Sequence, residues 1–115
     1  MYGRGAAEER AVRLVDLDPQ WVGAGGAGIH DRDGNPVPER HGVGLAFYCP
    51  CGCGERCYLA FANPLDGGPP KTNAGEATWE RTGETFAALT VRPSIQRVGG
   101  CRWHGFITNG EIASA

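Results

Sequence analysis

Short runs in which apolar and polar residues alternate recur along the chain, separated by glycine and proline. Val43, Leu45 and Phe47 fall on one face of a predicted strand over 42–48, because successive side chains of a strand point to opposite faces. Similar runs predict strands over 11–16, 57–61, 77–81, 84–91, 96–98, 106–108 and 111–113. No long amphipathic helix is indicated. The pattern favours a mostly β fold, either a small antiparallel β-sandwich or a partial barrel.

Turn residues predict which strands are neighbours. The strands at 42–48 and 57–61 flank a segment rich in cysteine and glycine, and we expect them to pair as a hairpin with that segment at its tip. Asn109-Gly110 is typical of a type I′ turn, so the last two predicted strands should form a second hairpin.

Glycine and proline also predict where regular structure stops. Pro93-Ser94-Ile95 is expected to end a strand, because proline has no backbone N–H to give to a ladder. The glycine-rich segment 23–28 is expected to be a mobile loop. Segment 63–73, which holds three prolines, is expected to be a long surface loop.

Length and charge narrow the class of protein. The chain has 115 residues, and we expect a single zinc-stabilised domain over 11–115 after a flexible leader at 1–10. The net charge is −2 with no basic block, so no cationic face for nucleic acid is indicated. No apolar run reaches the ~20 residues that span a bilayer, and the N-terminus lacks the apolar centre of a signal peptide. We therefore expect a cytoplasmic protein with no nucleic-acid or membrane partner, where thiols stay reduced.

Four of the five cysteines and one of the three histidines fall in two short runs, Cys49-Pro50-Cys51-Gly52-Cys53-Gly54 and Cys101-Arg102-Trp103-His104-Gly105. An odd, clustered set of cysteines favours a metal over disulfides. Tetrahedral zinc places thiolate sulfurs about 3.8 Å apart, and the glycines let the backbone curl enough for that. The runs therefore predict a zinc knuckle that staples the domain, with iron as the alternative metal. The fifth cysteine, Cys57, is expected to be buried.

The two runs offer five ligands for four positions: Cys49, Cys51, Cys53, Cys101 and His104. If the four cysteines complete the site, His104 stays available for proton transfer. If one cysteine is spare, His104 binds the metal and cannot act as a base. The spacing leaves both sets open. A closed four-ligand site has no position for water or substrate, so the zinc is expected to be structural.

Ser94 lies shortly before the second cysteine run and could meet His104 if the intervening residues form a strand and a turn. A serine hydroxyl becomes a nucleophile when a histidine removes its proton, and a carboxylate usually orients that histidine. Candidates for this carboxylate are Asp66, Glu76 and Glu84. The alternative is that Ser94 is only a turn residue after proline.

Four motifs occur together between residues 49 and 111: Cys-Pro-Cys-Gly-Cys-Gly at 49–54, Pro-Ser-Ile at 93–95, Gly-Cys-x-x-His at 100–104 and Asn-Gly-Glu at 109–111. In this combination, over 42–113, the chain resembles the BubE-type family. These are small domains of bacterial and phage genomes, some of which accompany bacterial ubiquitination-like operons.

The resemblance implies a serine peptidase or isopeptidase on a zinc-knuckle scaffold. It would cleave at the C-terminus of a ubiquitin-like protein, so its partners would be that protein or its conjugates. Ser94 would be the nucleophile and His104 the general base. The implied zinc ligands are Cys49, Cys51, Cys53 and Cys101.

Two other functions are compatible with the residues. A non-catalytic zinc-binding interaction module would use His104 as a ligand. The run at 101–105 also resembles the second half of a Rieske iron–sulfur motif, whose first half pairs cysteine with histidine. Cys51 stands where that histidine belongs, so a Rieske-like redox role lacks a ligand.

Overall fold

The computed structural model describes residues 12–25, 28–72, 75–97 and 100–115. The predicted leader at 1–10 lies outside the described residues. The elements in chain order are β1 (Val12–Arg13), η1 (Leu14–Leu17), β2 (Gln20–Gly25), β3 (Glu39–Tyr48), β4 (Arg56–Ala60), β5 (Glu80–Thr82), η2 (Phe86–Ala88), β6 (Thr90–Gln96), β7 (His104–Thr108) and β8 (Glu111–Ser114).

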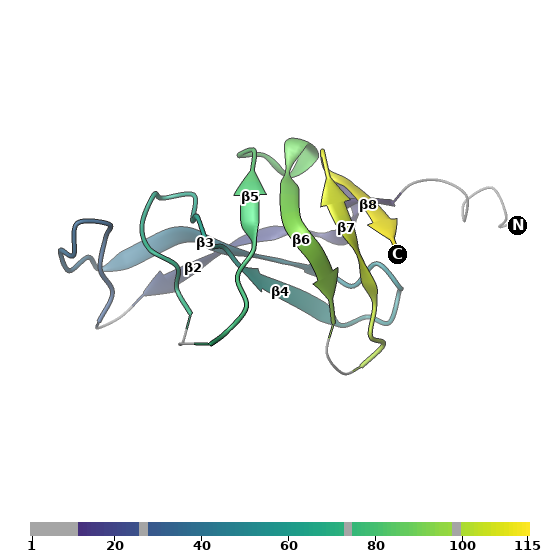
Figure 1. Cartoon of the computed structure of the whole chain (residues 1–115), viewed down its shortest axis with the longest axis horizontal. Helices are drawn as coiled ribbons and strands as arrows, with labels where there is room; N and C mark the ends of the chain where they lie inside the picture. Colours follow the sequence, from purple (N-terminus) through teal and green to yellow (C-terminus); the bar gives the residue numbers. More distant parts are fainter. Residues whose placement is uncertain (1–11, 26–27, 73–74, 98–99) are drawn as a thin grey trace, which may run out of the picture.

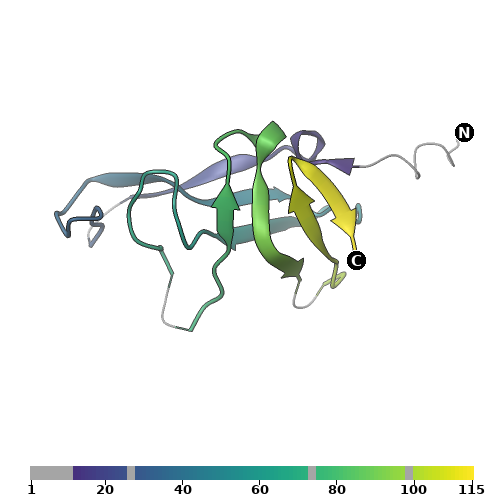
Figure 2. The same cartoon turned by 45° about the horizontal axis from the view of Figure 1, so that its top comes forward.

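The strands form two antiparallel sheets. One has five strands in the order β1-β8-β7-β6-β5, and the other has three in the order β2-β3-β4. The strands of one sheet run across those of the other, and the three-stranded sheet passes behind the five-stranded one (Figures 1 and 2). The prediction of a mostly β, antiparallel fold is therefore confirmed, without closure into a barrel. In the described ranges no helix is long and apolar enough to cross a membrane.

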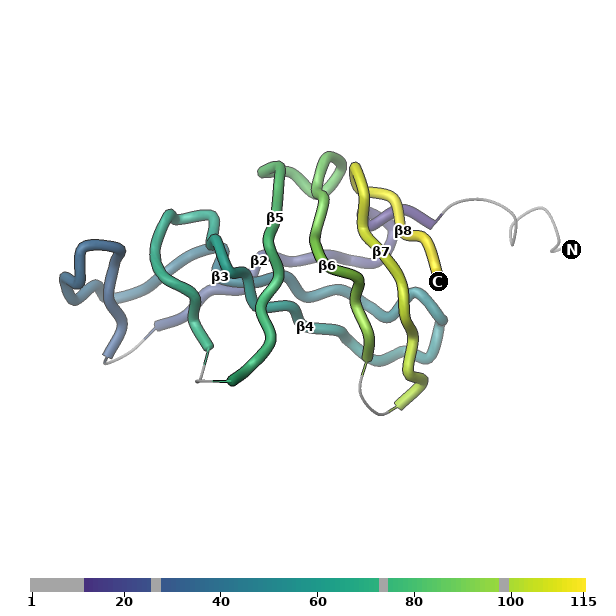
Figure 3. The backbone as a smooth tube through the Cα atoms, in the orientation of Figure 1, coloured from purple at the N-terminus to yellow at the C-terminus, as the bar shows by residue number. Residues whose placement is uncertain are grey.

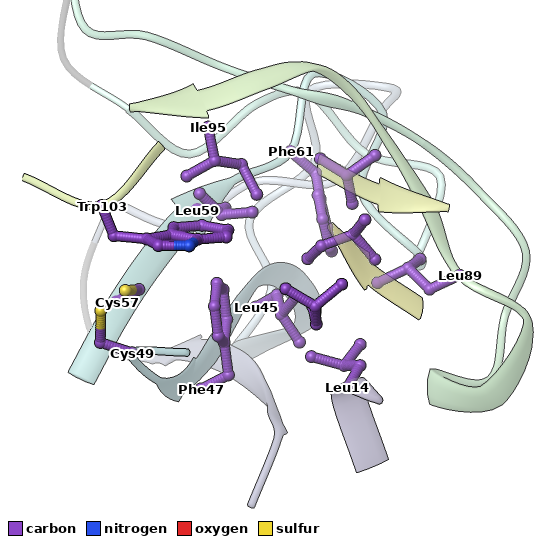
Figure 4. Close-up of a cluster of buried hydrophobic side chains, with 13 residues drawn as sticks. Leu14, Leu45, Phe47, Cys49, Cys57, Leu59, Phe61, Leu89, Ile95 and Trp103 are labelled. Atoms are coloured by element: carbon purple, nitrogen blue, oxygen red, sulfur yellow. The ribbon is translucent and has the colours of Figure 1, made fainter. Parts of the chain in front are cut away.

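Side chains from both sheets meet in one buried cluster (Figure 4). Phe47 and Phe61 are fully buried, and Trp103 packs over the same cluster. Burying an apolar side chain of this size stabilises the fold by roughly 1.5–3 kcal/mol. Cys57 is buried as predicted, and its sulfur lies beside that of Cys49 at the margin of the core.

Both predicted hairpins are confirmed. β3 pairs with β4, so the cysteine-rich segment forms the connection at the tip of that hairpin. β7 pairs with β8 across Asn109 and Gly110. These two residues have φ angles of 49° and 75°, and two positive φ values are what a type I′ turn requires.

The prediction that 93–95 ends a strand is wrong, because β6 runs through these residues. Between two paired positions, Arg92, Pro93 and Ser94 together face one residue of β7, Phe106. Strands tolerate proline at such a bulge because the ladder is already interrupted there. A bulge also changes the direction of the side chains it carries, which matters for Ser94.

The prediction of a mobile loop over 23–28 is wrong for 23–25, which belong to β2. Ala24 and Gly25 pair with β3, Gly23 lies at a register shift between paired positions, and residues 26–27 lie outside the described ranges. A Cβ at Gly23 would lie 3.0 Å from the carbonyl oxygen of Arg40. Glycine thus permits a close approach of two backbones here. The N-terminal strand is also shorter than predicted, because a 3₁₀ turn begins at Leu14.

Candidate active site and metal centre

Four cysteine sulfurs converge where the two sheets meet. The Sγ atoms of Cys49, Cys51, Cys53 and Cys101 all lie within 4.8 Å of one another. Cys49 Sγ is 3.3 Å from Cys51 Sγ and 3.3 Å from Cys101 Sγ. All four are free thiols. Because tetrahedral thiolates around zinc stand about 3.8 Å apart, the four residues fit a metal ion after small adjustments.

Two connections supply these cysteines. The first three come from the β3–β4 connection, where the N–H of Cys49 donates to Glu55 O at 2.8 Å and the N–H of Gly52 donates back to Cys49 O at 3.1 Å. Gly52 and Gly54 have φ of 87° and 85°, so glycine is needed for the tight curl. Cys101 comes from the β6–β7 connection, which lies at the same end of the molecule (Figure 3). A metal held here would join the two sheets.

Hydrogen bonding within the cluster gives two of its thiols, Cys51 and Cys101, different pKa values. Hydrogen bonding from Cys51 lowers the pKa of the Cys101 thiol to about 6. The same interaction, seen from Cys51, raises the pKa of that thiol to about 12. Cys101 therefore loses its proton more readily than Cys51, and the thiolate is the form that binds metal ions.

Arg97 is the cation beside the cluster. Its Nη1 donates toward Cys101 Sγ at 3.4 Å and Cys53 Sγ at 3.6 Å, and its Nη2 bonds Glu55 Oε1 at 2.9 Å. Glu55, and then the sulfurs of Cys49 and Cys101, raise the pKa of this guanidinium above its usual range. Four thiolates around a divalent ion carry excess negative charge, and a hydrogen-bonded cation offsets it while orienting the ligands.

Ser94 and His104 form a hydrogen-bonded pair on the five-stranded sheet. His104 Nε2 lies 3.0 Å from Ser94 Oγ, and both residues are half-buried. Ser94 stands in the bulge of β6, and His104 begins β7, where it pairs with Gln96. This is the distance at which a histidine can remove a serine proton. In the part of the chain that the structure describes, the group of possible metal ligands contains the four cysteines and not His104.

Backbone contacts fix both members of this pair. The indole N–H of Trp79 donates to the carbonyl oxygen of Ser94 at 3.2 Å. The N–H of Arg97 donates to Trp103 O at 2.8 Å, immediately before His104. The N–H of Ala115 donates to His104 O at 2.8 Å. These hydrogen bonds therefore hold β6 and β7 in place on both sides of the Ser94–His104 pair.

One predicted orienting carboxylate is engaged elsewhere. Asp66 accepts two hydrogen bonds from Arg40, at 2.8 and 2.9 Å, and these lower its pKa to about 2. The Arg40 side chain is only 3% exposed, so this ion pair belongs to the fold around β3. The roles suggested for Glu76 and Glu84 stay predictions.

A hollow of about 780 Å³ lies on the outer face of the five-stranded sheet, with Ser94 in its wall. The sequence pattern did not predict this hollow, since three of its lining residues, Arg92, Pro93 and Ser94, lie in the bulge of β6. The sequence also did not point to Trp79. The place of Arg97, four residues before Cys101, was a signal that could have linked it to the metal site.

Comparison with protein families matches residues 30–115 to the family described as the bacterial ubiquitination-like system serine protease (BubE). The match covers most of the chain, and the chain belongs to this family. No curated protein and no solved structure matches it.

Proposed function

We propose that this member of the bacterial ubiquitination-like system serine protease family is a serine peptidase or isopeptidase. Its substrate would be the C-terminal region of a ubiquitin-like protein or a conjugate of it. The family description supports a protease of a ubiquitination-like system. The observation that carries the residue roles is the 3.0 Å separation of Ser94 Oγ and His104 Nε2.

The reaction begins when Ser94 Oγ attacks the scissile carbonyl carbon and its proton passes to His104 Nε2. The C–N bond then breaks, and protonated His104 gives that proton to the leaving amine, so the acyl group is left as an ester on Ser94. Water, deprotonated by His104, attacks the ester. The products are a free carboxylate, the amine and the regenerated hydroxyl.

The bulge also offers a donor for the oxyanion. Ser94 stands at no paired position of β6 with either β5 or β7, so its backbone N–H is a candidate partner for the negative oxygen of the tetrahedral intermediate. One such donor typically contributes about 10²- to 10³-fold in kcat.

Zinc is the metal we propose for the cysteine cluster. The donor set, four thiols and no carboxylate, suits zinc, for which such a set is a structural site. When bound, zinc would supply cross-linking of the two connections and no open coordination position. Arg97 would hold Cys53 and Cys101 toward it, and the chemistry would stay with Ser94 and His104.

The test is cleavage of a ubiquitin-like protein that carries a C-terminal extension. Wild type should release the extension, and Ser94→Ala and His104→Ala should abolish release while the metal content is retained. Ser114→Ala is the matched control, because Ser114 is the chain's other serine and its hydroxyl accepts a bond from Trp103 at 3.0 Å. Full cleavage by Ser94→Ala would overturn the proposal. Loss of metal in His104→Ala would instead support a zinc-binding module that uses His104 as a ligand.

A further inference from the structure

The hollow beside Ser94 is shaped by the irregular part of the sheet. It spreads over β5, β6 and β7, which lie side by side in Figure 3. Its volume of about 780 Å³ falls within the roughly 300–1,000 Å³ typical of ligand pockets. The residues that line it are Ala62, Thr78, Glu80, Val91, Arg92, Pro93, Ser94, Phe106 and Thr108.

The hollow lies on one side of the Ser94–His104 pair. Its residues on β7, Phe106 and Thr108, follow His104 along the strand and lead away from the cysteine cluster. Ser94 is part of the wall, whereas His104 is not. The cluster and the hollow therefore flank the pair on opposite sides along these strands.

This asymmetry indicates which part of the substrate the hollow would bind. The histidine must reach the leaving amine to give it a proton, so the leaving group lies on the side of His104. The acyl part of the substrate then lies on the other side of the serine, where the hollow is.

The edge of β5 does not offer a free place for strand addition at Arg81. Asn63 donates from Nδ2 to Arg81 O and accepts from the N–H of Arg81 at Oδ1, both at 2.9 Å. Its side chain thus occupies the backbone groups that an added strand would use. Strand addition along β5 is therefore blocked at Arg81, whereas the face of the sheet that holds the hollow is open next to Ser94.

The walls indicate the chemistry of the ligand. Phe106 is an exposed aromatic side chain in the hollow, with 45% of its surface accessible, and Pro93, which is also exposed, adds further apolar surface. Glu80 and Arg92 are direct cross-strand partners of opposite charge, so they leave no net charge for a ligand to match. Apolar walls with a few polar groups are typical of a site that binds an apolar segment.

We propose that the hollow is the acyl-side subsite and that it binds an extended, uncharged peptide segment immediately before the scissile bond, with an apolar side chain against Phe106. The inference rests on the proposed peptidase function. The chain after the scissile bond leaves past His104 toward the β6–β7 connection.

Binding and cleavage separate this inference from the function on which it rests. In the Ser94→Ala protein, fluorescence anisotropy measures binding of a labelled pentapeptide of apolar residues that ends in a free carboxylate. Phe106→Ala should weaken this binding at least about tenfold, as for a central aromatic contact. Thr108→Trp, at an exposed position that fills the hollow, should weaken it similarly. Val15→Ala, at an exposed apolar position of η1, should have no effect.

Peptides that carry aspartate or lysine in place of the central apolar residue should bind more weakly than the parent. Equal binding to all three peptides, or unchanged binding in both Phe106→Ala and Thr108→Trp, would overturn the subsite. Binding to the hollow without any cleavage of the extended ubiquitin-like substrate by the wild-type protein would overturn the proposed function, and the hollow would then be a peptide-binding site with no acyl-side role. If the wild-type protein cleaves the substrate and kcat/KM is unaffected in both Phe106→Ala and Thr108→Trp, the proposed function stands and the subsite is overturned.

Discussion

The cysteine cluster and the Ser94–His104 pair use the same two strands in different ways. The cluster draws ligands from both sheets, three from the β3–β4 connection and Cys101 from the β6–β7 connection. The pair lies within the five-stranded sheet, on the two strands that this second connection joins. Only two residues, Arg102 and Trp103, separate Cys101 from His104. The cluster can therefore stabilise the fold while the Ser94–His104 pair carries out the reaction. The short segment between Cys101 and His104 links the two regions.

The largest expected effect is that of Ser94→Ala, which should abolish activity and leave stability unchanged. Ser94→Ala should lower kcat by at least about a thousandfold, because removing a nucleophile removes the whole covalent route. The metal content and the melting temperature should match wild type, since the Ser94 hydroxyl bonds His104 and the group of possible metal ligands found in the described ranges contains neither residue. Kinetics, elemental analysis and thermal unfolding measure these three quantities. A comparable loss of stability would show that the two regions are not separable.

Replacing a cysteine of the cluster should affect both regions. Cys101→Ser should weaken metal binding by more than about 100-fold, beyond the loss expected for outer-shell partners. It should also lower the melting temperature, because metal binding and folding share free energy, and activity should fall with it as the β6–β7 connection loosens. Competition with a chromogenic chelator measures the affinity. Cys57→Ala is the control, because Cys57 is outside the group of four and should keep the metal.

The Arg40–Asp66 pair tests stability away from both regions. Asp66→Asn should destabilise the fold by roughly 3 kcal/mol, the low end for a buried ion pair because Asp66 is a quarter exposed. The pKa of Asp66 is lowered to about 2, so its stabilising contribution is present above the usual pKa of aspartate and is lost as pH falls through about 2. Denaturant unfolding between pH 2 and 7, at about unit intervals, measures the difference from wild type. Glu39→Gln, in an exposed pair with His41, should change little, and an equal effect of both variants would contradict this account.

The smallest expected effect concerns the cation beside the cluster. Arg97→Gln should weaken metal binding by about 10- to 100-fold, as for other outer-shell partners. In the cobalt-substituted protein it should also shift the thiolate-to-metal charge-transfer band, because Cys53 and Cys101 lose a hydrogen bond. Arg102→Gln, at an exposed residue of the same connection, serves as the control. An unchanged affinity and an unchanged spectrum in Arg97→Gln would mean that this contact does not support the metal.

Local chemistry explains which features could be predicted from the sequence. Alternation predicted the strands at 42–48, 57–61 and 106–108, Asn109-Gly110 predicted its turn, and clustered cysteines predicted a metal site. The choice of the four cysteines as the ligand set came from the family resemblance. These features depend on residues close together or on one repeated type. The meeting of Ser94 with His104 was recognised as a possibility, and its support came mainly from family resemblance.

Other features depend on register, which a single sequence does not reveal. Pro93 suggested a break, whereas the sheet absorbs it in a bulge that faces Phe106. Trp79 and Arg97 act through contacts with residues that are distant in sequence or belong to another connection. Residues 23–25 form part of a strand because β3 supplies partners for Ala24 and Gly25.

The central claim is that His104 activates Ser94, and covalent labelling tests it most directly. A fluorophosphonate probe should modify the wild-type protein at Ser94, located by peptide mass spectrometry, and should not modify Ser114. His104→Ala should remove most of this labelling while the cysteine cluster keeps its metal, and His41→Ala should leave it unchanged. Labelling of Ser94 that is as fast in His104→Ala as in wild type, or labelling at Ser114 instead, would contradict the claim.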